Sequence, residues 1–250
     1  MKGWQIFAHS VRLVFSNLEQ ALRVSLVLYL VQVANQVAFF LNPPEMVEVG
    51  GMSYPEMSAG GTFQSLILGL LAVVASLWIA VAWHRFVLAE EYPQGWLPRW
   101  HGSNMLSYLG RSILVGLLIT LAVLVVSVPL GLITMAAPGL AALLPILMVG
   151  LAAFLFFRLS VMLPAAALGH KMKLGEAWEE TSGETDTILV LAAVVAGASI
   201  LIQLPTMLNG DPGSFISLIY GLVVNWFATI IGISLLTTLY GHFIEKRPID

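Results

Sequence analysis

The chain has 250 residues, of which 58% are hydrophobic and 10% charged, with a formal net charge of −3. Its mean hydropathy is +0.90. A soluble domain of this length lacks the polar surface to cover so many apolar side chains, so the composition predicts a membrane protein. The chain contains no cysteine, which excludes disulfides, thiolate catalysis and cysteine metal sites. No segment concentrates the positive charge that a nucleic-acid partner requires.

The first segment, residues 3–16, is predicted to form an amphipathic helix at the membrane surface. Large apolar side chains recur there at helical spacing, while polar side chains take the other faces. Ser16 followed by Glu19 fits a capping box, which predicts a break before the first span. The apolar positions are Trp4, Phe7, Val11, Val14, Phe15, Leu18 and Leu22.

Six apolar segments are each long enough to cross the roughly 30 Å hydrocarbon core of a bilayer as a helix. They lie near 22–41, 64–86, 112–135, 140–163, 187–208 and 215–241. We therefore expect one all-α membrane domain over residues 1–250, with six transmembrane helices in three hairpins.

Segments rich in Pro and Gly connect the spans on one side, the predicted outer side. The turn at 136–139 is so short that the third and fourth spans must be antiparallel neighbours. Residues 209–213 join the last two spans. The longest outer loop, 42–63, is expected to be irregular.

The predicted inner loops, 87–111 and 164–186, are longer. Pro164 is expected to end or bend the fourth span, because proline lacks the N–H that an α-helix requires. Apolar spacing over 172–181 predicts a short helix at the membrane interface.

Basic residues give the orientation. All of them fall outside the apolar spans or near the inner ends of the spans, and all lie on one side when the spans cross the bilayer alternately. Because cytoplasmic flanks are enriched in Lys and Arg, both termini are predicted to be cytoplasmic. The charged residues of the outer segments are all acidic: Glu45, Glu48, Glu56 and Asp211. The bases are Lys2, Arg12, Arg23, Arg85, Arg99, Arg111, Arg158, Lys171, Lys173, Lys246 and Arg247.

A weak internal repetition follows the hairpins. Ser16-Asn17 precedes the first span and Ser103-Asn104 precedes the third. Two interpretations remain open. The hairpins are true repeats, or the same interfacial chemistry selects similar residues without common descent.

Polar side chains within the spans are the first set of candidate functional residues. Such groups face the bundle interior, where they join helices by hydrogen bonds or line a path for a polar substrate. No Asp, Glu, Lys or Arg lies at the middle of a predicted span, which argues against an ion-driven transporter. The candidates are Gln32, Asn35 and Gln36 in the first span and Asn225 and Thr229 in the sixth.

The cytoplasmic face provides the second set, a candidate docking face. It comprises His84, Arg85, Arg99, Trp100, His101, Arg158 and Trp178. An interfacial metal enzyme is an alternative, if His84 and His101 converge with Glu90 or Glu91. The sequence contains no HExxH, P-loop or GxSxG motif, so an ordinary polar interface is the simpler interpretation.

The series Arg158, Pro164-Ala165 and Ala177-Trp178 resembles the segment after the fourth helix in a family of six-helix membrane domains. These domains are fused to some bacterial glycerophosphodiester phosphodiesterases, and YciC-like relatives stand alone. The resemblance implies a bacterial inner-membrane location and no established activity. No segment of this sequence corresponds to the catalytic barrel of the fused enzymes, so the resemblance does not extend to hydrolysis.

From these observations we expect a non-catalytic scaffold, accessory subunit or assembly factor, without cofactor or metal. Its expected surroundings are the lipid bilayer and a membrane-protein partner or further copies of the chain. The main alternative is a transporter or channel for a small neutral or lipid-like substrate.

Overall fold

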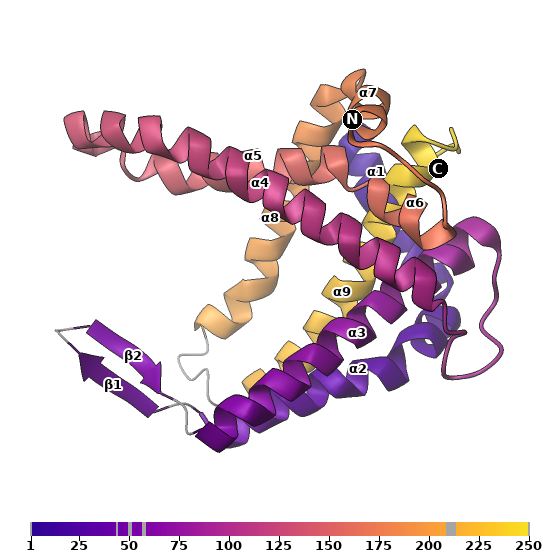
Figure 1. The fold of residues 1–250 in the computed structure, drawn as a ribbon, viewed down its shortest axis with the longest axis horizontal. Helices are drawn as coiled ribbons and strands as arrows, with labels where there is room; N and C mark the ends of the chain where they lie inside the picture. Colours follow the sequence, from indigo (N-terminus) through magenta and orange to yellow (C-terminus); the bar gives the residue numbers. More distant parts are fainter. Residues whose placement is uncertain (1, 44, 50–51, 57–58, 209–213, 250) are drawn as a thin grey trace.

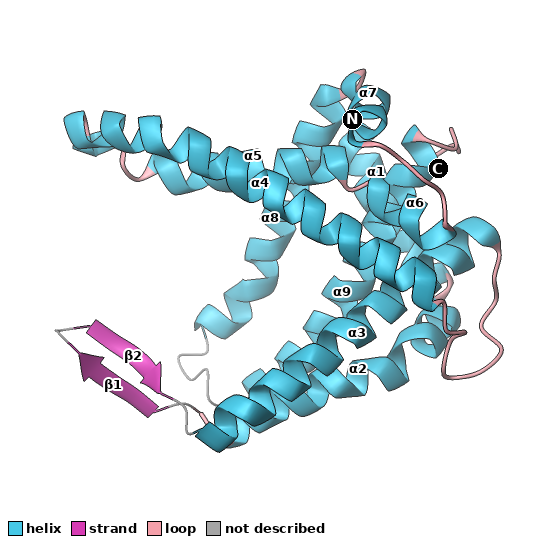
Figure 2. Cartoon of the chain, viewed as in Figure 1, coloured by secondary structure: helices cyan, strands magenta, loops and turns pink. Residues whose placement is uncertain are grey.

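A computed structural model describes residues 2–43, 45–49, 52–56, 59–208 and 214–249. The chain is 83% helical, and two short strands form a hairpin apart from the helices (Figure 2). Six helices are long and apolar enough to cross a membrane, which confirms the all-α polytopic fold.

The helices in chain order are α1 Lys2–Ser16, α2 Leu18–Leu41, α3 Ala59–Ala89, α4 Gly102–Ala136, α5 Leu143–Leu159, α6 Met162–Leu168, α7 Leu174–Ser182, α8 Thr185–Leu208 and α9 Phe215–Phe243, with a 3-10 turn at Pro138–Leu140 and strands β1 Glu45–Val49 and β2 Met52–Glu56. The candidate spans are α2, α3, α4, α5 with α6, α8 and α9. Several spans extend beyond their predicted ends, and α4 begins at Gly102 rather than near residue 112.

The break between α1 and α2 falls at Asn17, as the sequence predicts, but the expected capping box is wrong. No side-chain hydrogen bond caps the start of α2. Asn17 Nδ2 instead donates to the Leu13 carbonyl at 2.8 Å. The Glu19 carboxylate accepts from Arg23 at 2.7 Å and does not fold back over the helix start.

The fourth span breaks where Pro164 requires it. A proline ring clashes with the carbonyl four residues earlier, which here belongs to Ser160. Helix α5 ends at Leu159, and α6 begins at Met162 with Pro164 in its first turn. Proline is tolerated in the first turn of a helix, so the chain bends without losing the short helix.

The expectation of an irregular outer loop over 42–63 is wrong for its described part. Strands β1 and β2 pair antiparallel, with Val47 opposite Tyr54. β-branched and aromatic side chains favour strands, a signal that the Pro and Gly content of the loop obscured. Residues 44, 50–51, 57–58 and 209–213 lie outside the described part, so the predicted turn at 209–213 is not tested.

The buried core lies toward one end of the molecule. Helices α2, α3 and α9 pack together, α4 packs on α5 and α6, and α8 packs on α1 and α5 (Figure 1). We call this end the base; it comprises α1, α6, α7, segment 90–101 and the adjoining ends of the spans. Fully buried side chains include Trp83, Met162 and Leu239, whereas Leu70 and Leu132, farther along α3 and α4, are exposed. Exposed apolar surface of this kind suits contact with lipid.

Helix α1 is integrated into the base. Its buried stripe is Gly3, Ile6, Ser10 and Val14, and it packs on α8 and α9. Of these four residues, only Val14 belongs to the apolar face predicted from the sequence. The small and polar members were missed because they permit close helix contact rather than add hydrophobicity.

The last two helices do not form a closely packed hairpin like α2 with α3. Helix α1 packs on both α8 and α9. Farther along, Tyr220 Oη of α9 donates to the Ile202 carbonyl of α8 at 2.8 Å.

Candidate functional site

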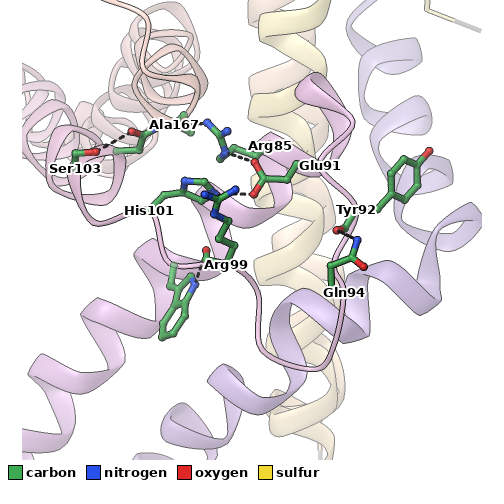
Figure 3. Close-up of polar contacts among 10 residues, drawn as sticks. Arg85, Glu91, Tyr92, Gln94, Arg99, His101, Ser103 and Ala167 are labelled. Atoms are coloured by element: carbon green, nitrogen blue, oxygen red, sulfur yellow. Dashed lines mark hydrogen bonds and ion pairs between the residues drawn. The ribbon is translucent and has the colours of Figure 1, made fainter.

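Segment 90–101 joins α3 to α4 and is anchored by one carboxylate (Figure 3). Glu91 Oε2 accepts from Arg85 Nε at 2.7 Å. The other oxygen, Oε1, lies 2.7 Å from His101 Nε2. An ionised carboxylate can only accept, so His101 Nε2 carries the proton. The last turn of α3 and both ends of the segment therefore meet at Glu91.

The electrostatics keep this anchor charged. Partial burial raises the pKa of Glu91, but hydrogen bonds from His101 and Arg85 and the positive charge of these groups outweigh it. The net pKa of Glu91 lies below its ordinary value of 4.5. Glu91 is therefore ionised at neutral pH and pairs with both partners.

Further contacts hold the segment and the adjoining ends of α3 and α4 in place. The Ala167 carbonyl at the end of α6 accepts from Asn104 Nδ2 at 2.6 Å and from Arg85 Nη1 at 3.4 Å. Trp78 Nε1 of α3 donates to the Arg99 carbonyl at 3.3 Å. The rings of Trp78 and Trp100 meet edge to face, with centroids 4.7 Å apart.

A cavity of about 470 Å³ lies between this segment and the helices. Val24 of α2 and Ala82 of α3 give it an apolar wall, and Arg85, Glu91 and His101 give it a charged wall. Arg85 and His101 both bind Glu91, so these three residues belong to the anchor of the segment.

The outer surface of segment 90–101 exposes large side chains. Trp96 is 56% exposed and Trp100 55%. Tyr92 and Leu97 are also more than half exposed. Indole rings combine an apolar body with a polar N–H and suit the membrane interface and protein interfaces.

The predicted docking face separates into two parts. Arg85, Arg99, Trp100 and His101 gather at segment 90–101. His84 does not belong to an exposed face, because its side chain is 0% exposed.

The buried His84 side chain contacts Thr237 and Tyr108 and joins α3 to α9 and α4. Its Nδ1 lies 2.8 Å from Thr237 Oγ1, and its ring stacks on that of Tyr108 with centroids 5.7 Å apart. The Thr237 hydroxyl already donates its proton to the Ile233 carbonyl. His84 Nδ1 must therefore be the donor, and Nε2 faces the Tyr108 hydroxyl at 3.5 Å.

Arg158 and Trp178 form a separate pair on α5 and α7. The Arg158 guanidinium lies 4.5 Å from the Trp178 ring centroid and 5.0 Å from that of Phe154. It also donates to the Thr185 hydroxyl. Through these contacts Arg158 holds α5, α7 and α8 together. Its side chain is 4% exposed, so it is not part of an exposed docking face.

The proposed metal set does not assemble. His101 meets Glu91, but His84 points to Thr237 and Tyr108. Among the residues that the structure describes, no three His, Asp or Glu side chains lie close enough to hold a metal ion.

Three of the candidate polar residues within the spans, Gln32, Gln36 and Asn225, connect helices. Gln32 Nε2 of α2 donates to Ser76 Oγ of α3 at 3.0 Å. Asn225 Nδ2 of α9 donates to Gln36 Oε1 at 3.5 Å, and Thr229 donates to the Asn225 carbonyl of its own helix at 2.7 Å.

Stronger contacts between α2 and α9 come from residues outside the candidate set. Trp226 Nε1 donates to Ser25 Oγ at 2.8 Å, and Tyr29 Oη to the Leu222 carbonyl at 2.8 Å. Asn35 makes no hydrogen bond with its side chain to any described residue. This pattern favours helix-to-helix contact over a substrate path.

Comparison of the chain with models of protein families, with curated proteins and with solved structures finds no match in any of the three. The helical fold and its six apolar helices define the class, an all-α multi-pass membrane protein.

Proposed function

We propose that the protein is a non-catalytic scaffold, accessory subunit or assembly factor that binds an integral membrane protein. The contact is made by Trp96, Leu97, Arg99 and Trp100, which we call the loop surface. The observation that carries the proposal is that this surface is exposed while Glu91 anchors the segment beneath it. Tryptophan and arginine are enriched among residues that dominate binding energy, and a preorganised segment loses little entropy on binding.

The membrane location of the loop surface supports an integral partner. Segment 90–101 directly joins two candidate spans, α3 and α4. Aromatic residues at span ends lie at the level of the lipid headgroups. A partner that contacts the loop surface must therefore reach the membrane interface, as a neighbouring transmembrane helix does.

We place the base and both termini in the cytoplasm. The termini are close together at the base (Figure 1), and Glu184 accepts from Lys2 at 2.5 Å while lying 3.5 Å from His242 Nε2. The one-sided Lys and Arg residues support this orientation. The resemblance to bacterial six-helix membrane domains supports the bacterial inner membrane as the location.

A transporter is less well supported. Gln32 and Asn225 donate hydrogen bonds to neighbouring helices. The cavity under segment 90–101 and the basic cavity described below are lined by residues of the base and its adjoining helix ends, and neither is lined by these two residues.

Site-specific photocrosslinking in native membranes tests the proposal. A photoreactive amino acid at position 96 should yield a discrete protein adduct. The same group at position 117, where Leu117 is exposed on α4, is the control and should crosslink to lipid only. Absence of a protein adduct at positions 96, 97 and 100, or the same adduct at position 117, would contradict the proposal.

A further inference from the structure

A second cavity at the base, of about 440 Å³, lies where α4 passes the end of α6. Ser107 and Arg111 line it from α4, and His170 and Lys171 line it from the segment after α6. No Asp or Glu is among its lining residues. It is separate from the cavity under segment 90–101.

Arg111 and Lys171 of this second cavity differ from most cations of the base, which are paired. Lys2 pairs with Glu184, Arg85 with Glu91 and Lys246 with Glu180. Within the described residues, the side chains of Arg111 and Lys171 have neither an ion pair nor a hydrogen bond. Two uncompensated cations therefore face one cavity, which favours an anionic ligand.

The backbone after α6 holds His170 and Lys171 in place at the cavity. Gly169 has a φ of 84°, a left-handed conformation that glycine adopts without strain and that ends α6. The His170 N–H donates to the Ala165 carbonyl at 2.8 Å. The ring Nδ1 of His170 lies 3.1 Å from Tyr240 Oη of α9. Lys171 thus follows a fixed turn.

The cavity opens beside surface suited to acyl chains. Leu114 lines it, and Ile113 and Leu117 on the same helix are more than half exposed. A ligand with a negative headgroup and an apolar tail matches both features. Basic pockets between transmembrane helices are a recurrent form of headgroup site.

We infer that this cavity binds the phosphate group of an anionic phospholipid, with Arg111 and Lys171 as its cationic contacts and α4 as the surface for its acyl chains. The inference is independent of the partner proposed above, because none of these residues belongs to the loop surface.

Native mass spectrometry of the purified protein with phosphatidylglycerol tests the inference. The double variant Arg111→Gln/Lys171→Gln should bind this lipid roughly thirtyfold more weakly, taking the contribution of about 1 kcal/mol that each Lys or Arg makes near anionic lipid. Lys173→Gln is the matched control, because Lys173 is exposed nearby and does not line the cavity. It should leave the affinity unchanged.

Two further ligands distinguish an anionic lipid headgroup from other phosphate groups. Phosphatidylcholine should bind far more weakly than phosphatidylglycerol, and excess inorganic phosphate should not displace the lipid. The swap Arg111→Lys/Lys171→Arg should retain binding, which separates loss of charge from loss of folding. Equal affinity of the Gln double variant and the wild type, equal binding of phosphatidylcholine, or displacement by inorganic phosphate would overturn the inference.

Discussion

Gly3 of α1 lies so close to Thr187 of α8 that a Cβ atom on Gly3 would be 2.5 Å from the Thr187 carbonyl oxygen. The same Cβ would be 2.7 Å from the backbone nitrogen of Leu191. Both atoms belong to the backbone of a helix and cannot move aside independently. Glycine at position 3 is therefore a condition for the contact between α1 and α8.

Gly3→Ala should lower the free energy of unfolding by about 1–3 kcal/mol, the usual cost of overpacking. Thermal unfolding in detergent measures the change. Gly197→Ala in α8 is the control, because a Cβ there meets nothing within 4 Å and alanine favours a helix over glycine by roughly 0.5–1 kcal/mol. Equal stability of the two variants would show that α1 does not pack this closely.

His84→Leu should destabilise the protein by about 2 kcal/mol, because it removes the buried 2.8 Å hydrogen bond between His84 and Thr237. Tyr108→Phe should cost less than about 1 kcal/mol, since its hydroxyl lies 3.5 Å from His84 and contacts that long are weak. Chemical unfolding of both variants tests this order. A larger loss for Tyr108→Phe would contradict the assignment of the Thr237 contact as the stronger of the two.

Glu91→Gln should destabilise the protein at neutral pH by about 1 kcal/mol or less, because the ion pairs of Glu91 are partly exposed. The pKa of Glu91 is lowered in the folded state. Its contribution is therefore complete above the ordinary pKa of 4.5 and is lost as the pH falls through the folded-state value. Unfolding midpoints of wild type and variant should converge at acid pH. A constant difference would contradict this account of the anchor.

Gln36→Leu and Asn225→Leu should show a coupling energy of about 0.6 kcal/mol or less in a double-mutant cycle, the average for such pairs between helices in membranes. Their contact of 3.5 Å is long. Neither variant should alter the flux of small solutes in reconstituted vesicles. A specific flux that these substitutions abolish would favour the transporter over the scaffold.

The spans could be predicted because each depends on local properties. Apolar runs of sufficient length identified all six helices, and the short helix expected over 172–181 is present as α7. Pro164 predicted the break after α5, since its ring excludes a helical carbonyl at Ser160.

Tertiary contacts set the remaining features. Arg158 was expected at a surface, but Phe154 and Trp178 enclose it. Glu91 was considered only as a metal ligand, although Arg85 six residues earlier was a signal for an ion pair. The buried stripe of α1 contains Gly3 and Ser10, and hydrophobicity alone cannot identify such positions.

Purification from native membranes in a mild detergent tests the central claim, that the loop surface binds a membrane partner. The wild type should copurify with a stoichiometric membrane protein, and Trp96→Ala/Trp100→Ala should reduce its recovery at least roughly tenfold. Trp4→Ala/Phe15→Ala removes two exposed aromatic side chains from α1 and should retain the partner. Recovery of the wild type only as a lone monomer under several extraction conditions, or equal retention by the Trp96→Ala/Trp100→Ala variant, would contradict the claim.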